Sequence, residues 1–440
     1  MGGQTDLRDA SALAERLAQG VPLARALPDP QPHDWLALDE GVRWRSRYGS
    51  GGPRPGWERP ALLHAGTALL DDSRLALTLC HRDGRVRAAA LHPAKTRPAL
   101  LPLVVIRCAD WAEPVRTRAR DILAATLDGD SATALAPLLL LVGRGERGAF
   151  GLRLLDGVLR AAPDDRLRVL FDSPDRGARR YAYRLALETG RLDPGELART
   201  AARRGEDPVV QDLCATAALA ALPDVFRSAD AHEDVLGPLL SARNPRCRSA
   251  GVTALRRTGR PQRAEPFLAD RSSVVRACAR YVVRQAGGDP WAWYRARCAA
   301  PDDPDLAPGA VIGLAEGHQQ ADAELLWPLL AHPAPAVRAR AVAGLRELDL
   351  AHGDRLRRLL DDPAPGVVRE TTTALLPWAP GLPAEWLLDR AGPGRPRHVR
   401  AAALRLLMAR VGSGELRAVE RLLADADPEL RVRAERWAQR

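Results

Sequence analysis

Apolar residues recur along this chain at the spacing of an α-helix, within one phrase that is repeated many times. The phrase is a turn containing Pro or Asp, then Val-Arg, then small and aliphatic residues, as in PAVRARAVAGL and RHVRAAALRLL. In the first of these copies, Val337, Ala341 and Leu345 stand four residues apart. This spacing places all three side chains on one face of a helix, and the small middle residue allows a neighbouring helix to approach closely.

A second apolar segment precedes each turn, such as AELLWPLL before PAVRARAVAGL. Pro and Gly between the two segments end one helix and begin the next. The arginines of three consecutive copies, Arg338, Arg369 and Arg400, are 31 residues apart. Copies of the phrase run from about residue 80 to the end, which makes about eleven or twelve units, and no strand-like alternation interrupts them. The sequence therefore predicts an all-α fold.

This helix–turn–helix unit resembles the HEAT repeat in its short bacterial form, and CHRDGRVRAAAL and LPLVVIRCADWAEPVRTRAR resemble uncharacterised actinobacterial proteins of this type. The resemblance covers roughly 80–440. It implies an α-solenoid superhelix of about eleven or twelve HEAT-like helix pairs with N- and C-terminal caps, the Val-Arg helices lining the concave side. It also implies a ladder in which the arginine of each phrase pairs with acids of the turns: Arg116, Arg248, Arg276, Arg338, Arg369 and Arg400.

The first sixty residues differ from the rest, so the predicted domains are an N-terminal cap at 1–60 and the repeat solenoid at 61–440. The cap contains GSGGPRPG, which must be a loop. Arginines and tryptophans stand near this loop, and they are Arg43, Trp44, Arg45, Arg47 and Trp57. Two interpretations remain open: these tryptophans cover the first repeat, or they belong to a mobile binding loop. A C-terminal cap is predicted in PELRVRAERWAQR, where Arg436 interrupts the apolar stripe.

Composition narrows the class of protein. Aromatic residues make up only 4% of the chain, so alanine and leucine must supply most of the core. The six cysteines are scattered without a C-x-x-C pair, which favours reduced thiols in a cytoplasmic protein. The chain has no apolar run long enough to cross a membrane, and its acidic N-terminus does not resemble a secretory signal. The oligomeric state stays open.

Motifs for catalysis and for cofactors are missing from the sequence. It contains no G-x-S-x-G and no phosphate-binding loop followed by Lys-Ser/Thr. A solenoid family that binds two irons carries paired His-Glu dipeptides, whereas here the dipeptide occurs once, at His232. Cys80, His81 and His92 lack a fourth ligand for a metal ion. The sequence therefore favours a non-enzymatic protein without a metal or another cofactor.

Positive charge is concentrated in the middle of the chain. The formal net charge is +10, and residues 243–297 hold 13 arginines against three acids, a local net charge of +10 (13 − 3). Arg276, Arg280 and Arg284 are four residues apart, so they form one strip beside the buried stripe of a helix. The candidate binding residues are Arg256, Arg280, Arg284, Trp291, Trp293, Arg295 and Arg297, with Arg120 further upstream.

Three functions are compatible with these residues. The leading hypothesis is a scaffold or adaptor that binds a protein partner, or an acidic segment of one, on the concave face. The second is sequence-independent binding of a DNA or RNA backbone through 243–297. The third is an enzyme resembling the HEAT-like DNA glycosylases, for which Trp291, Trp293 and Asp289 are suitable residue types. The competing interpretation is a solvated basic face, with both tryptophans in the core and Asp289 capping a helix.

Overall fold

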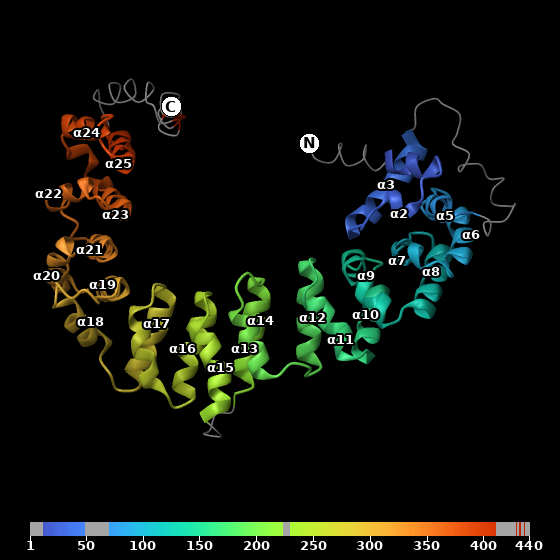
Figure 1. Cartoon of the computed structure of the whole chain (residues 1–440), viewed down its shortest axis with the longest axis horizontal. Helices are drawn as coiled ribbons and strands as arrows, with labels where there is room; N and C mark the ends of the chain where they lie inside the picture. Colours follow the sequence, from blue (N-terminus) through green and yellow to red (C-terminus); the bar gives the residue numbers. More distant parts are fainter. Residues whose placement is uncertain are drawn as a thin grey trace. The chain divides into compact units, whose positions relative to one another are not determined.

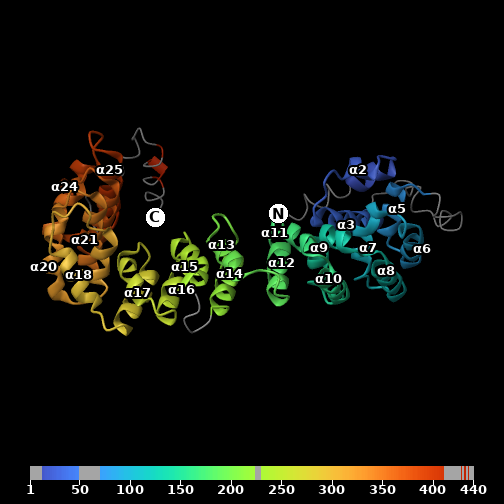
Figure 2. The ribbon, with the colours of Figure 1, turned by 60° about the horizontal axis from the view of Figure 1, so that its bottom comes forward.

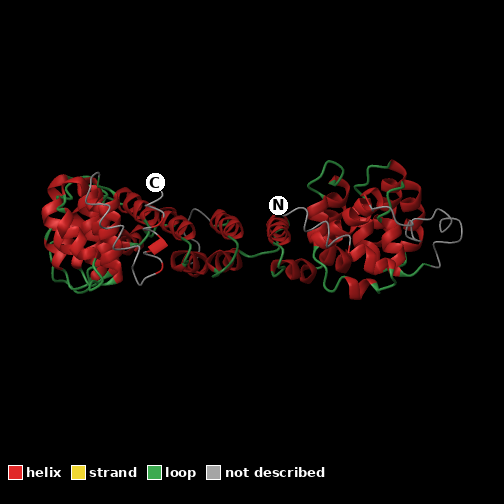
Figure 3. Ribbon diagram, turned by 90° about the horizontal axis from the view of Figure 1, so that it is seen from above, coloured by secondary structure: helices red, strands yellow, loops and turns green. Residues whose placement is uncertain are grey.

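The computed structural model describes residues 12–48, 70–222 and 229–410, together with residues 428, 431, 432 and 435. All regular elements in these residues are helices, and none of the described residues is in a strand (Figure 3). The all-α prediction is confirmed. The chain divides into two compact units, 1–193 with 207–213 and 194–206 with 214–440, and each is described by itself.

The first unit begins with a short helix over residues 12–18, and four helix pairs follow after residue 70 (Figure 1). Its further elements are α2 (Leu23–Ala26), α3 (Pro32–Tyr48), α5 (Asp72–Leu79), α6 (Gly84–Ala94), the 3₁₀ helix η3 (Pro98–Leu100), α7 (Leu101–Arg107), α8 (Glu113–Thr126), α9 (Gly129–Val142), α10 (Ala149–Ala161), α11 (Asp164–Phe171) and α12 (Arg176–Glu188).

The second unit continues with seven successive pairs, of which α14 begins in residues assigned to the first unit. In several pairs the first helix is short or 3₁₀. The elements are α13 (Pro194–Ala202), α14 (Pro208–Ala220), α15 (Ala229–Ser241), α16 (Pro245–Arg257), η4 (Pro261–Ala269), α17 (Ser273–Gln285), α18 (Pro290–Cys298), α19 (Pro308–Ala315), η5 (Gln320–Asp322), α20 (Ala323–Leu326), η6 (Pro328–Ala331), α21 (Pro335–Glu347), α22 (Gly353–Leu356), η7 (Arg357–Asp361), α23 (Pro365–Leu375), η8 (Leu376–Gly381), α24 (Ala384–Ala391) and α25 (Arg397–Met408).

Each pair packs against the pairs next to it in the chain. In the first unit α7 contacts α8 and α9, and in the second unit α21 contacts α19 and α23. The predicted stripe of Val337, Ala341 and Leu345 is fully buried on α21. Burial against sequential neighbours alone is the architecture of an α-solenoid, so the fold-class prediction is confirmed. The described part of the chain contains no helix with the length and apolar character that crossing a bilayer demands.

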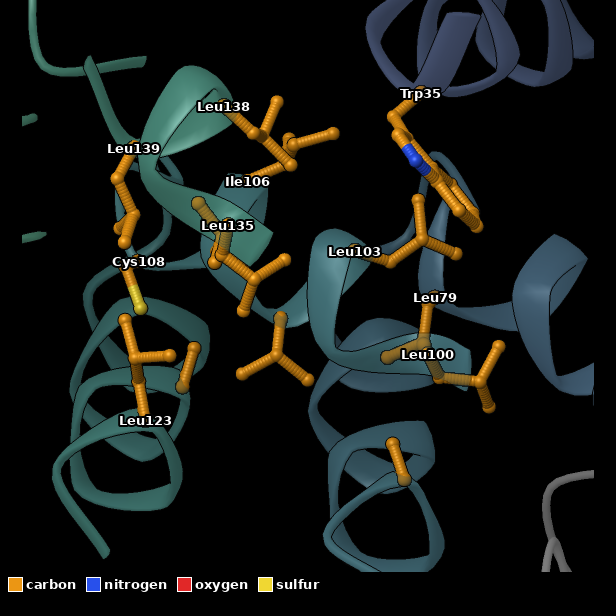
Figure 4. Close-up of a cluster of buried hydrophobic side chains, with 14 of the residues drawn as sticks. Trp35, Leu79, Leu100, Leu103, Ile106, Cys108, Leu123, Leu135, Leu138 and Leu139 are labelled. Carbon is orange, nitrogen blue, oxygen red and sulfur yellow. The ribbon is translucent and has the colours of Figure 1, made fainter. Parts of the chain in front are cut away.

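The N-terminal helices share the core of the first unit. Helix α3 packs on α7 and α9 (Figure 2). Trp35 is 7% exposed and points toward Leu103 in the close-up of this core (Figure 4). Trp35 thus packs on the first helix pairs, and the division into a cap at 1–60 and a solenoid at 61–440 stays a prediction. Of the other predicted cap residues, Trp57 and most of the C-terminal cap lie outside the described residues, as do the side chains of Trp44, Arg45 and Arg47.

Candidate functional site

The arginine ladder is present and accounts for several of the conspicuous arginines. Arg248 donates from Nε and Nη2 to the two carboxylate oxygens of Asp270, at 2.9 and 2.8 Å. Its Nη1 donates to the carbonyl oxygens of Ala242 and Arg243 in the turn before its own helix. Since Asp270 lies in the turn of the next repeat, one guanidinium joins two repeats. The same contacts recur in two more pairs, Arg87 with Asp110 and Arg338 with Asp362.

Three members of the predicted ladder differ. Arg116 donates from Nη1 to the carbonyl oxygens of Asp110 and Trp111 and has no carboxylate partner among the described residues. Arg276 donates to the carbonyl oxygen of Asp270, but its carboxylate partner is Glu316 in the turn that follows α19. Arg369 has a side chain that is 72% exposed, and its ion pair is with the adjacent Glu370. Arg338 is the fourth residue of α21, counted from the proline that begins the helix. The fourth residue of α23, counted in the same way, is Val368, and it is buried. The Val-Val-Arg phrase is therefore displaced by one residue.

In the first unit the ladder extends into a buried ionic network. Arg107 contacts Asp110 through Nη1 at 3.0 Å and Asp39 through Nη2 at 2.5 Å. Arg43, which the sequence assigned to a possible binding loop, contacts Asp39 at 3.0 Å. Burial lowers the pKa of the Arg43 guanidinium, although Asp39 opposes this shift. Because Arg87 also contacts Asp110, the network contains three arginines, Arg43, Arg87 and Arg107. Two aspartates, Asp39 and Asp110, oppose them. The side chain of Arg43 thus forms ion pairs with Asp39 on its own helix α3 and, at 4.0 Å, with Asp110.

Acids outside the basic segment neutralise much of its charge. Most of the partners come from neighbouring repeats, which lie about thirty residues away in the sequence, and Asp303 lies in the turn after the helix of its own partner. Glu233 contacts Arg260 and Arg263, Glu316 contacts Arg276 and Arg280, Asp322 contacts Arg295, and Asp303 contacts Arg297. The local net charge of +10 in the sequence is therefore not the charge of this surface.

The predicted strip of arginines on α17 has three different environments. Arg276 is buried against Glu316. Arg280 contacts the same carboxylate, and its guanidinium lies 5.4 Å from the centre of the Trp291 ring. Arg284 is exposed and forms no ion pair with the described residues. Only the last of these cations is available to a ligand without breaking an existing pair.

Both tryptophans on α18 are half-buried around Tyr294. The rings of Trp291 and Trp293 lie 5.6 and 5.3 Å from the Tyr294 ring. Trp293 also donates from its indole nitrogen to Glu265 at 3.1 Å. Asp289 accepts the backbone N–H groups of Trp291 and Ala292, as an N-cap does. The three residues on which the glycosylase hypothesis rests, Trp291, Trp293 and Asp289, therefore each have contacts within the fold: the tryptophans pack around Tyr294, and Asp289 caps α18.

The remaining candidates, Arg256 and Arg120, belong to different units. Arg256 is exposed on α16, with its guanidinium 5.8 Å from the Tyr281 ring. Arg120 belongs to the first unit, where it donates to the carbonyl oxygens of Cys108 and Arg147 and lies 5.1 Å from the Phe150 ring.

An apolar groove in the first unit was missed by the sequence analysis. It has a volume of about 930 Å³ and lies between the start of α3, the segment from η3 into α7, and helices α9 and α11. Trp35, Leu135 and Leu138 form part of its wall, and Val169 on its edge is 59% exposed. The lining also includes six prolines, which are Pro30, Pro32, Pro98, Pro102, Pro137 and Pro174. Only the pairing of prolines with tryptophan near residue 32 could have indicated it.

Charge around this groove is predominantly negative. Three aspartates line it, and they are Asp130, Asp172 and Asp175. Among the described residues, the one arginine in its lining is Arg166, which contacts Asp130 at 2.7 Å and Asp165 at 3.8 Å. The groove therefore combines apolar walls with an acidic rim, a combination that suits an apolar segment carrying a cation.

No family model matches the sequence, and no curated protein matches it. Solved structures that resemble it include Kap121p bound to Nup53p, at 13% identity and a TM-score of 0.32 over 80% of this chain and 47% of that one. Kap95p, in a structure with RanGDP, matches at 12% identity and a TM-score of 0.31 over 98% and 72%. A TOG domain array of a microtubule polymerase matches at 12% identity and a TM-score of 0.24 over 92% and 97%. The chain spans about half the length of Kap121p, and likenesses this weak carry no information on function.

Proposed function

We propose that this chain is a non-enzymatic scaffold of the short bacterial HEAT-repeat type, which binds a protein partner in the cytoplasm. The observation that supports it is the apolar groove of the first unit. A concave site of this volume, with apolar walls and a few polar groups, has the character of a binding pocket. The groove is lined by first helices of the pairs, α7, α9 and α11, rather than by the Val-Arg helices.

The occupant is an extended segment of another protein with apolar side chains and at least one Arg or Lys. Apolar side chains fill the wall formed by Trp35 and Leu138, while the cation faces the acidic rim near Asp175. Because the prolines of the lining have a fixed φ, little chain entropy is lost when a segment binds. A preformed site of this kind suits a scaffold that holds its partner without chemistry.

Selection of peptides from a random library against the full chain tests this proposal. The selected sequences are expected to share apolar residues and a cation. Val169→Glu should weaken their binding at least about tenfold, because it places a carboxylate on the edge of an apolar site. Val274→Glu is the matched control, since Val274 is 56% exposed on α17 and lies outside the groove. Acid-rich peptides, or equal binding to Val169→Glu, would refute the proposal.

Binding of a nucleic-acid backbone through 243–297 is the second candidate function. It is favoured by Arg256 and Arg284, which are exposed and without an acidic partner among the described residues. Arg256→Glu/Arg284→Glu should abolish retention of an oligonucleotide at about 50 mM salt, where phosphate contacts are strongest. Arg153→Glu, which changes one exposed arginine of the first unit, is the control. If the wild-type chain ignores DNA and RNA at this salt, the candidate is dismissed.

A further inference from the structure

A second pocket, polar and shallow, lies among the turns of three successive pairs in the second unit. Its volume is about 550 Å³. It is lined by Arg204 from the turn after α13, by Arg243 from the turn between α15 and α16, and by Arg271 from the turn between η4 and α17. All three arginine residues are exposed. Repetition of the solenoid brings together three cations that are as much as 67 residues apart in the chain (271 − 204).

The pocket has no described acid that is available to neutralise these three cations. Its only lining carboxylate, Asp270, is occupied by Arg248 on both oxygens and also accepts the N–H of Ser272. Arg271 makes one hydrogen bond, from Nη2 to the carbonyl oxygen of Arg243 at 3.1 Å. None of the three arginines forms an ion pair with the described residues. With the Arg248–Asp270 pair counted as neutral, the pocket has a net charge of +3.

We propose that this pocket binds a phosphate monoester, carried by a phosphorylated side chain of a protein partner. A guanidinium presents several N–H donors in a fixed plane and binds two phosphate oxygens at once. A phosphomonoester offers three terminal oxygens and about two negative charges near neutral pH. Three guanidinium groups around one concavity match that number of oxygens and that charge. Recognition of phosphorylated segments by arginine clusters is a general mode of peptide binding.

The same features disfavour a nucleic-acid backbone at this position. Phosphodiesters carry one charge each and follow one another along a strand, so their binding sites are long tracks with aromatic side chains between the cations. Here the arginines line one pocket, and the remaining lining residues, Ser241 and Ala242 with the Arg248–Asp270 pair, include no aromatic ring. A single dianionic group is the better match. The arginine pocket lies in the second unit and shares no residue with the apolar groove of the first unit. Phosphate binding here therefore does not depend on peptide binding in the groove.

Fluorescence anisotropy with the full chain tests the site. The probe is a labelled phosphoserine peptide flanked by glycines, compared with its unphosphorylated form, with inorganic phosphate as competitor and with an oligothymidine strand. We expect binding of the phosphopeptide alone among the labelled probes. Arg243→Glu/Arg271→Glu should weaken it more than about tenfold, because it removes charge-assisted hydrogen bonds. Arg256→Glu/Arg284→Glu, an equal charge change in the same segment and outside the pocket, should leave it unchanged.

Three controls keep the outcome interpretable. Arg204→Glu changes an exposed side chain that forms no hydrogen bond with the described residues, so it should weaken binding even if the double variant misfolds. Val169→Glu in the groove should not affect the phosphopeptide, which separates failure here from failure of the proposed function. Equal affinity for both peptides, competition that shows free phosphate binding as tightly as the peptide, or tighter binding of oligothymidine would each overturn the inference.

Discussion

Arg338 and Asp362 join two successive repeats through hydrogen bonds of 2.8 and 2.9 Å. Their side chains are only 13% and 6% exposed. Arg338 also donates from Nη1 to the carbonyl oxygens of His332 and Pro333. One guanidinium thus satisfies a carboxylate and a turn in a largely dry environment, so removal of either partner leaves buried polar groups without hydrogen bonds.

We expect Arg338→Ala to lower the free energy of unfolding by about 3–5 kcal/mol, the usual cost of breaking a buried ion pair from one side. Arg369→Ala is the matched control, because each of the two arginines directly follows the valine of its repeat phrase. Its side chain is 72% exposed, so the expected loss is below about 1 kcal/mol. Urea denaturation of both variants measures the difference. Equal losses would contradict the displaced register of α23.

Acid should weaken the ladder. Burial alone would raise the pKa of Asp270, but the hydrogen bonds from Arg248 and Ser272 and the charge of Arg248 outweigh it and lower the pKa. The pKa of Asp110 is lowered in the same way by Arg87. Carboxylates with a lowered folded-state pKa stabilise the fold above the unfolded value of about 3.9, and this stabilisation is lost as the pH falls through the folded value.

The corresponding experiment measures the urea midpoint of the wild type and of Asp270→Asn from pH 7 to pH 3. The wild type should lose stability steeply below about pH 4. Asp270→Asn should be less stable at pH 7 and should lose less on acidification, since it lacks one of the titrating groups. Parallel pH curves for the two proteins would show that Asp270 does not titrate as the structure indicates.

Much of this fold could be predicted because every copy of the repeat shows the same pattern of buried positions. The stripe of Val337, Ala341 and Leu345 is set by helical geometry, and each copy confirms the others. The ladder followed from the family resemblance, but its exact register did not. Either valine of the Val-Val-Arg phrase could correspond to Val337, and only packing decides that Val367 does, so that Val368 takes the position of Arg338 and Arg369 is exposed.

The candidate site was less predictable, because its charges are paired across repeats. Counting within 243–297 omits Glu316 and Asp322, whose carboxylates reach back by one repeat to Arg280 and Arg295. Likewise, the groove is assembled largely from helices, and the arginine pocket from turns, that are far apart in the sequence. The pocket had one periodic signal in the sequence. Arg271 follows the turn residue Asp270, and Arg243 follows Ala242, the corresponding turn residue of the preceding repeat.

The thiols should differ sharply in reactivity. Burial raises the pKa of Cys108, Cys214 and Cys298 to about 12 and raises that of Cys80 as well, so these thiols carry almost no reactive thiolate near neutral pH. Cys278 on α17 is the one cysteine that is half-buried rather than buried. A disulfide reagent at pH 8 should modify Cys278 rapidly in the native chain and the other thiols only after unfolding. Rapid reaction persisting in Cys278→Ser would contradict this.

Two glycines in the same register of their helices should respond oppositely to alanine. Gly309 and Gly366 each follow the proline that begins α19 and α23. A Cβ on Gly309 would lie 1.9 Å from the carbonyl oxygen of Ala269, whereas a Cβ on Gly366 meets nothing within 4 Å. Because the obstacle at Gly309 is backbone of η4, it cannot rotate away. Gly309→Ala must therefore displace one repeat from the next.

We expect Gly309→Ala to destabilise the protein by about 1–3 kcal/mol, the usual cost of overpacking. Gly366→Ala should be neutral or stabilising by up to about 1 kcal/mol, because alanine loses less backbone entropy in a helix. Thermal melting followed by circular dichroism compares the two variants with the wild type. Since both changes add the same methyl group at the same helical position, the difference between them isolates the close approach of η4 and α19. A melting temperature unchanged in Gly309→Ala would show that these two elements pack further apart than described.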